Sequence, residues 1–189
     1  RPMPARPVAD RDEARERLPE PSLEYKLDGA RVQVPKRGGE VRVFSRQGNA
    51  VTNAVPELVA AVATLPAREI VLDGETLALT PEGRPLPFQT TMRRFGRRSG
   101  RQDDDAALRT SLPLSTFCFD CLALDGQTLI DAPTRERHLA LAEALPPQLI
   151  IPRLPAADAN EAQRFLGAAF AAGHAGLMGK HPEAVSYTH

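Results

Sequence analysis

The chain has 189 residues, of which 42% are hydrophobic and 25% are charged, and its 24 basic residues balance 24 acidic ones. This length suits one large domain or two small ones with a sizeable core. A formal net charge of zero excludes general nucleic-acid binding by the whole chain, so such binding must come from local patches. No apolar run approaches the ~20 residues that span a bilayer, and no signal-peptide pattern is present, which predicts no membrane partner and a cytoplasmic or other intracellular setting.

Residues 1–21 are rich in proline and charge and are predicted to form a linker or lead-in. Apolar and polar residues then alternate over 23–28, the period-two pattern of a half-buried strand. Glu24, Lys26 and Asp28 would share one face of this strand. The strand is predicted to pass through Gly29 and continue beyond it.

A β-hairpin is predicted next, with arms at residues 31–34 and 41–44. Pro56 suits the first turn of a following helix. Residues 70–79 read as a strong strand, and residues 88–98 have helical potential with a dense arginine cluster.

The rest of the chain continues this mixture. Residues 117–124 form a predicted buried strand and residues 133–145 a helix. A second helix begins at Asp158, in an aspartate version of the capping box, and ends before Gly173. Residues 176–180 read as a short strand. Strands outnumber helices and several are hairpin-linked, so the predicted fold class is α+β with mainly antiparallel sheet.

Two cysteines, Cys118 and Cys121, form a C-x-x-C string inside a predicted strand. Their odd spacing places the side chains on opposite faces of a regular strand. Redox pairs of this type need a helix N-terminus, and zinc needs about four ligands. Ordinary packing is therefore favoured over a metal or redox role.

Lys26 is the residue with the most chemical interest. A lysine acts as a nucleophile only when deprotonated, and its ordinary pKa is about 10.4, so a special environment is needed. Taken alone, Lys26 is better explained as a solvated strand lysine paired with Glu24 or Asp28. The strings that follow along the chain change this balance.

Five strings occur in the order of the sequence motifs of covalent nucleotidyltransferases, and the region resembles these enzymes from Glu24 to Lys180. The strings are Glu24-x-Lys26-x-Asp28-Gly29-x-Arg31, Ser45-Arg46-x-Gly48, Leu72-Asp73-Gly74-Glu75, Phe119-Asp120-Cys121-Leu122 and Ala175-Gly176-Leu177-Met178-Gly179-Lys180. The arginine-rich stretch after Pro87 also resembles cellular ATP-dependent DNA ligases, which argues against a capping enzyme.

The resemblance implies a ligase adenylation-domain (ATP-grasp-like) fold, in which two mainly antiparallel sheets flanked by helices enclose a nucleotide cleft. Residues 22–189 would be a C-terminally truncated adenylation domain, joined through residues 1–21 to a preceding DNA-binding domain. It implies ATP as the AMP donor, Mg²⁺ or a similar divalent metal, and nicked double-stranded DNA as partner of a monomeric full-length enzyme. The AMP would pass to the 5′-phosphate of the nick, which the 3′-hydroxyl then seals.

The resemblance also implies residue roles. Lys26 would attack the α-phosphate of ATP and form a covalent lysyl-AMP, and Glu24 would lie at the adenine edge. Arg31 and Arg46 would hold ribose or phosphate, a task that suits a guanidinium. Glu75 would contact the ribose or the metal, although taken alone it is better explained as a polar strand residue facing solvent.

Phe119 would stack on adenine, although the pattern alone favours a core residue. Lys180 would act as an electrostatic clamp on the α-phosphate. The family position before Gly176 is normally glutamate and here is Ala175, which removes a carboxylate from the implied metal site. The arginine cluster Arg93, Arg94, Arg97 and Arg98 would contact phosphates of DNA. Three aspartates, at 103–105, follow it, so an internally compensated mobile loop is an equal alternative.

Two alternatives remain open at this point. The substitution at Ala175 and the early end of the chain are compatible with a catalytically impaired module that binds nucleotide or DNA. The chain is also compatible with another covalent nucleotidyltransferase, an RNA ligase or a capping guanylyltransferase.

Overall fold

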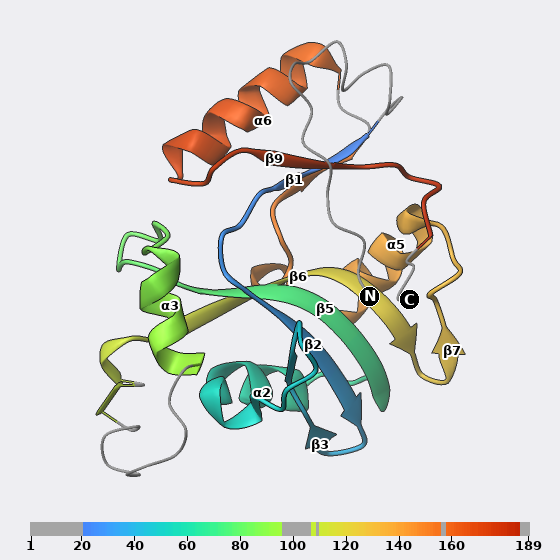
Figure 1. The fold of residues 1–189 in the computed structure, drawn as a ribbon. Coiled ribbons are helices and arrows are strands. Elements are labelled where there is room, and N and C mark those ends of the chain that lie inside the picture. Colours follow the sequence, from blue (N-terminus) through green and yellow to red (C-terminus); the bar gives the residue numbers. More distant parts are fainter. Residues whose placement is uncertain (1–20, 96–106, 109, 156–157, 186–189) are drawn as a thin grey trace.

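The computed structural model describes residues 21–95, 107–108, 110–155 and 158–185. Within these ranges the chain forms two antiparallel sheets with helices packed around them (Figure 1). The predicted α+β class, with two mainly antiparallel sheets flanked by helices, is confirmed. The predicted lead-in lies outside the described residues except for Pro21. Among the described residues, no helix is long and apolar enough to cross a membrane.

The larger sheet has six strands and the smaller has three. The larger contains β2 (Ala30–Arg37), β3 (Glu40–Val41), β4 (Phe44–Ser45), β5 (Glu69–Ala78), β6 (Leu114–Leu124) and β7 (Gln127–Thr128), and the smaller contains β1 (Ser22–Tyr25), β8 (Arg153–Leu154) and β9 (Leu177–Lys180). The α-helices are α2 (Pro56–Ala63), α3 (Phe88–Phe95), α5 (Thr134–Ala144) and α6 (Ala159–Ala171), and short 3₁₀ turns lie at η1 (Thr52–Ala54) and η2 (Pro147–Leu149).

In the smaller sheet, β1 is central and pairs antiparallel with β8 on one side and β9 on the other. Helix α6 covers this sheet (Figure 1). Its capping box is present, with Asp158 and Glu161 bonded to each other's backbone amides. Its end is also as predicted, since Gly173 has a φ of 88°. Near this end, Phe170 is 56% exposed.

The predicted continuous strand through Gly29 is wrong. Strand β1 ends at Tyr25, and the chain crosses over residues 26–29 into β2, which belongs to the other sheet. A Cβ on Gly29 would lie 2.5 Å from the backbone oxygen of Thr76, so only glycine allows this close approach. Two strands joined end to end show the same period-two pattern as one, and the pattern therefore missed the crossover.

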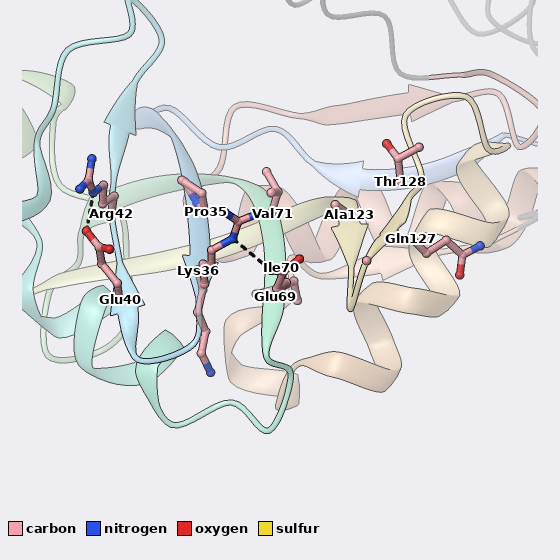
Figure 2. Close-up of a pocket in the computed structure, with 12 residues that line it drawn as sticks. Pro35, Lys36, Glu40, Arg42, Glu69, Ile70, Val71, Ala123, Gln127 and Thr128 are labelled. Atoms are coloured by element: carbon pink, nitrogen blue, oxygen red, sulfur yellow. Dashed lines mark hydrogen bonds and ion pairs between the residues drawn. The ribbon is translucent and has the colours of Figure 1, made fainter.

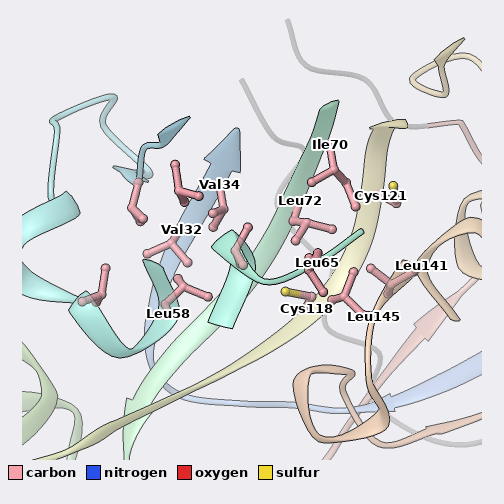
Figure 3. Close-up of a cluster of buried hydrophobic side chains, with 14 of the residues drawn as sticks. Val32, Val34, Leu58, Leu65, Ile70, Leu72, Cys118, Cys121, Leu141 and Leu145 are labelled. Carbon is pink, nitrogen blue, oxygen red and sulfur yellow. The ribbon is translucent and has the colours of Figure 1, made fainter. Parts of the chain in front are cut away.

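The hydrophobic core lies against one face of the larger sheet, beneath α2 and α5 (Figure 3). Burial of these aliphatic side chains is the main favourable term for folding. Core residues include Val32, Val34, Leu58, Leu65, Ile70, Leu72, Leu141 and Leu145. The predicted hairpin is present as β2 and β3, with Gly38 in the turn at a φ of 57°.

Strand β6 contains a β-bulge that changes which side chains face the core. Gly74 pairs with Cys118, but the preceding residue Asp73 pairs with Asp120, so Phe119 is an extra residue in β6. The bulge shifts the alternation by one. Cys118 and Cys121 consequently both lie in the core (Figure 3), and the prediction that they face opposite sides is wrong. Their predicted packing role agrees with this placement, and burial raises both thiol pKa values, to about 12 and about 11.

Candidate active site between the two sheets

The face of the larger sheet opposite the core, here called the site face, carries the charged residues of the motifs. Arg31 pairs with Glu75 in the register of β2 and β5, and Asp73, two residues before Glu75 in β5, lies on the same face. Phe119 joins them through the bulge. From the smaller sheet, Lys180 of β9 reaches the same place, with its ammonium 4.6 Å from the centroid of the Phe119 ring.

Phe119 links the two sheets through both its ring and its carbonyl. A bulged residue is left out of the ladder, so its backbone groups are available to other partners. The Phe119 carbonyl oxygen accepts from the Arg153 guanidinium at 3.2 Å and from the Lys180 ammonium at 3.4 Å. The Arg31 guanidinium lies 5.4 Å from the ring centroid, within the range of a cation–π contact.

Arg31 is held by Asp73 in a bidentate ion pair, with distances of 3.0 and 2.5 Å. Burial raises the pKa of Asp73, and the hydrogen bonds and charge of Arg31 oppose this rise. The geometry is bidentate, with both carboxylate oxygens accepting from the guanidinium fork. The direction of the Arg31 side chain is thereby fixed on the site face.

Glu24 is 2% exposed and lies at the centre of a cationic cluster. Its Oε1 accepts from Arg153 Nε at 2.9 Å and its Oε2 lies 2.7 Å from Lys180 Nζ. The β1 register explains both contacts, since Arg153 is directly opposite Glu24 and Lys180 is diagonal to it on the other neighbour. The carboxylate is therefore shared between cations from two strands.

His138 of α5 lies beside this cluster, with Nε2 3.4 Å from Glu24 Oε1. Burial lowers the pKa of His138 to about 2, and the nearby charges of Arg153 and Lys180 act in the same direction. The imidazole is therefore neutral, and its contact with Glu24 is not an ion pair. Its Nε2 is buried without a hydrogen-bond partner among the described residues.

Glu75 differs from the other site-face carboxylates because it has no ion pair among the described residues. Burial raises its pKa to about 7, while the charge of Arg31 and the backbone amide of Gly29 act the other way. Asp73 is used by Arg31, and Asp120 accepts from Arg137 at 2.7 Å. In the part of the chain that the structure describes, no group of three or more potential metal ligands occurs.

Lys26 lies directly after β1, at the start of the crossover between the sheets. Its backbone amide donates to the Gly176 carbonyl at 2.9 Å, which places it beside the last motif. The side chain is exposed and makes no hydrogen bond or ion pair with the described residues. The alternative pairing with Glu24 is thus not seen, because that carboxylate is used by Arg153 and Lys180.

Other predicted site residues lie elsewhere or are used differently. Arg46 is exposed in the turn after β4, and Ala175 is exposed just before β9. Arg93 is exposed on α3, as a DNA contact requires. The prediction for Arg94 is wrong, because its side chain is 2% exposed and its guanidinium binds Glu57 and the carbonyls of Leu112 and Ala54. Arg97 and Arg98 lie outside the described residues.

The sequence did not point to Arg153 or His138. Arg153 lies in a two-residue strand after apolar residues, with no motif around it. His138 is a single histidine in a helix and by itself favours no function. Both become part of the site only through long-range pairing with Glu24, which is 129 residues from Arg153 in sequence.

A shallow pocket lies away from these residues, where β2, β3, β5 and β6 meet beside β7 (Figure 2). Four of its charged side chains already form ion pairs, Arg37 with Glu69 at 3.0 Å and Arg42 with Glu40 at 2.7 Å. It contains none of the motif residues that meet between the two sheets. The site at Phe119 and Lys180 is therefore the better candidate on chemical grounds.

Comparison with known sequences identifies relatives along nearly the whole chain. The family profile described as "ATP dependent DNA ligase domain" matches residues 2–188. A "Probable DNA ligase" of Anaeromyxobacter sp. (strain Fw109-5) is 56% identical over 179 residues, covering 95% of this chain and 34% of the relative. A "Probable DNA ligase" of Sorangium cellulosum (strain So ce56) is 53% identical over 159 residues, 84% of this chain and 29% of the relative. The chain thus spans about a third of these relatives' length.

Solved structures give the same grouping. Mycobacterial DNA ligase D, complexed with ATP and MES, superposes with a TM-score of 0.65 at 26% identity, over 89% of this chain and 50% of that chain. The Chlorella virus DNA ligase–adenylate shares the fold, with a TM-score of 0.63 at 12% identity over 98% of this chain and 62% of that one. The ordered motifs, the two-sheet fold and the family match agree, and the chain belongs to the ATP-dependent DNA ligase domain family.

Proposed function

We propose that the chain is the adenylation domain of a DNA ligase and that Lys26 is its nucleophile. The free amine of Lys26 attacks the α-phosphorus of ATP, forming a phosphorus–nitrogen bond. The bond to the β-phosphate oxygen breaks, pyrophosphate leaves and the lysine proton goes to solvent. The observation that carries the proposal is the position of Lys26, which lies beside Gly176 at the start of the crossover, next to the strands that bear Lys180 and Glu24. Its side chain is exposed and has no ion pair with the part of the chain that the structure describes.

The surrounding residues support a nucleotide in this place. The Phe119 ring, approached by two cations, offers a stacking surface for adenine, and stacking is worth about 1–3 kcal/mol per base. The Lys180 ammonium has three donors, of which Glu24 and Phe119 take two, so one is left for a phosphate oxygen. Arg31 is fixed in direction by Asp73, which supports its proposed role in holding ribose or phosphate. We also propose that Arg46 holds ribose or phosphate and that Glu24 lies at the adenine edge.

A divalent metal fits the site only as an ion held mainly by the nucleotide. Mg²⁺ in nucleotide sites is commonly bound by one or two carboxylates together with substrate phosphates and water. Glu75 is a site-face carboxylate that forms no ion pair with the described residues, and Ala175 supplies no second carboxylate. Bound there, the metal would neutralise phosphate charge; Glu75 would orient it.

In the longer protein, we propose that AMP passes from Lys26 to the 5′-phosphate of nicked double-stranded DNA, and that the 3′-hydroxyl then seals the strand. Arg93, exposed on α3, is proposed to contact DNA phosphates, and Arg97 and Arg98 are retained in that proposal. Arg94 is not, because it is buried. No membrane partner is proposed.

The test is covalent labelling. Wild-type chain is incubated with ATP labelled at the α-phosphate and with magnesium, then denatured, and the protein-bound label is counted. Lys26→Ala and Lys26→Arg are expected to lose the label, by at least about a hundredfold, because the nucleophile is removed. Circular dichroism and thermal unfolding are expected to match wild type, since the Lys26 side chain makes no hydrogen bond or ion pair with the described residues and its backbone bond to Gly176 is kept in both variants.

Arg37→Ala is the control, since Arg37 is exposed at the far end of β2 and its ion pair among the described residues is with Glu69. Normal labelling of a Lys26 variant would contradict the proposal. If wild type does not label but Ala175→Glu does, the catalytically impaired module is the better description. Labelling from GTP in preference to ATP would favour a capping guanylyltransferase.

A further inference from the structure

The Glu24 cluster carries an additional role for a residue outside the motifs. We propose that Arg153 is a positioning residue that neutralises Glu24, so that the positive charge of Lys180 remains available to the α-phosphate of the nucleotide. This inference rests on the proposed function, because it takes the phosphate to lie at Lys180. It adds to the nucleotide site a residue that contacts no nucleotide itself.

The two cations use different oxygens of Glu24. Arg153 approaches Oε1 with two nitrogens, Nε at 2.9 Å and a terminal nitrogen at 2.8 Å, whereas Lys180 approaches Oε2 at 2.7 Å. Glu24 therefore orients the Lys180 side chain through one oxygen and binds Arg153 through the other. The ammonium can turn toward a phosphate oxygen while the guanidinium continues to hold the carboxylate.

The charge balance gives Arg153 its importance. Glu24 contributes one negative charge, and Arg153 and Lys180 contribute one positive charge each, so the cluster carries a net charge of about +1. His138 is neutral, and the adjacent Arg137 is paired with Asp120. Without Arg153, Glu24 and Lys180 would cancel each other. A phosphate would then meet a neutral pair in place of a cation.

Arg153 also has the geometry that this task needs. Its side chain is 13% exposed and its fork binds Glu24 and the Phe119 carbonyl at once, so it is fixed relative to the aromatic ring. A lysine has a single charged nitrogen and is able to supply the charge but not both contacts. Charge and geometry are therefore separable by substitution.

The experiment measures the binding of AMP and of adenosine to each variant by calorimetry. The ratio of the two affinities isolates the contribution of the phosphate and cancels effects on the base. In Arg153→Met the AMP affinity is expected to fall by about tenfold and the adenosine affinity by less than about twofold. In Arg153→Lys the ratio is expected to stay within about threefold of wild type. Arg37→Met, at the far end of β2, is the matched control and is expected to behave as wild type.

The double variant Glu24→Gln/Arg153→Met covers the case in which Arg153→Met fails to fold, because it leaves no unpaired buried carboxylate. Its cluster again has a net charge of about +1, so its AMP-to-adenosine ratio is expected to return to within about threefold of wild type. An unchanged ratio in Arg153→Met, or a ratio that stays low in the double variant, overturns the inference alone. If wild type binds neither AMP nor adenosine and takes no label, the proposed function fails, and the inference fails with it.

Discussion

At the scale of single residues, the pKa of Glu75 reflects how deeply the site face is buried. It lies on the site face of β5 between Arg31 and the crossover at Gly29. Burial raises its pKa to about 7 from an ordinary value of 4.5, so the folded chain binds a proton more readily there than the unfolded chain. A group of this kind makes stability fall as pH rises through the interval between the two values.

Replacing Glu75 by Gln therefore tests the environment of this carboxylate. Between about pH 4.5 and pH 7 the wild-type contribution of Glu75 to the free energy of unfolding is expected to decrease, by on the order of 1–3 kcal/mol. Glu75→Gln is expected to lack this decrease and to be more stable than wild type at pH 8. Urea unfolding at pH 5, 6, 7 and 8 measures it. Glu143→Gln, on the exposed side of α5, should keep the wild-type slope; an identical slope in Glu75→Gln would refute the assignment.

At the scale of elements, the crossover and the bulge bring the site residues together. The crossover at residues 26–29 moves the chain from the smaller sheet to the larger one within four residues. The bulge at Phe119 directs an aromatic ring toward Lys180 of the smaller sheet and a carbonyl that accepts from Arg153 and Lys180 of that sheet. Both are irregular stretches of backbone, and each carries a residue of the sequence motifs, Lys26 in the crossover and Phe119 in the bulge.

Gly29 is expected to be required for the observed backbone path of the crossover. In Gly29→Ala the new Cβ would lie 2.5 Å from the Thr76 backbone oxygen, so the crossover must shift. Unfolding is expected to cost about 1–3 kcal/mol less than in wild type, and labelling of Lys26 is expected to slow. Gly39→Ala is the matched control, because a Cβ there meets nothing within 4 Å. Equal stability of the two variants in urea would count against the close approach.

Much of this architecture was predictable from local sequence. Strands, capped helices and each separate motif are encoded within a few consecutive residues, and the capping box of α6 is an example. The crossover, the bulge and the partner of Glu24 depend on which strands pair across the fold. Hydrophobic alternation carries no information on that pairing, and so it placed Lys26 within a strand and left Arg153 unnoticed.

At the scale of the whole molecule, charge is balanced locally as well as in total. The chain has a formal net charge of zero, and several of its arginines are used inside the fold, as Arg94 is by Glu57 and Arg137 by Asp120. Only part of the arginine content is therefore available to a polyanion. Electrostatic attraction to DNA scales with the phosphates that are neutralised.

Binding of the isolated chain to nicked DNA is consequently expected to be weak, with a Kd of about 1 μM or higher at physiological salt, and to decline steeply with salt. Arg93→Met is expected to lower the slope of log K against log salt by about one, because Arg93 is exposed. Fluorescence anisotropy over a salt series measures both. Tight binding that does not respond to salt would exclude this electrostatic description.

The crossover has a mechanical meaning as well. The amide of Lys26 is bonded to Gly176 before β9, whereas Gly29 lies against β5. The Lys26 nitrogen, the proposed nucleophile, is thus tied to the smaller sheet, whereas the Phe119 ring, the proposed platform for adenine, belongs to the larger sheet. We therefore expect the distance between the nucleophile and a bound nucleotide to depend on the relative orientation of the two sheets, with the four crossover residues as the link between them.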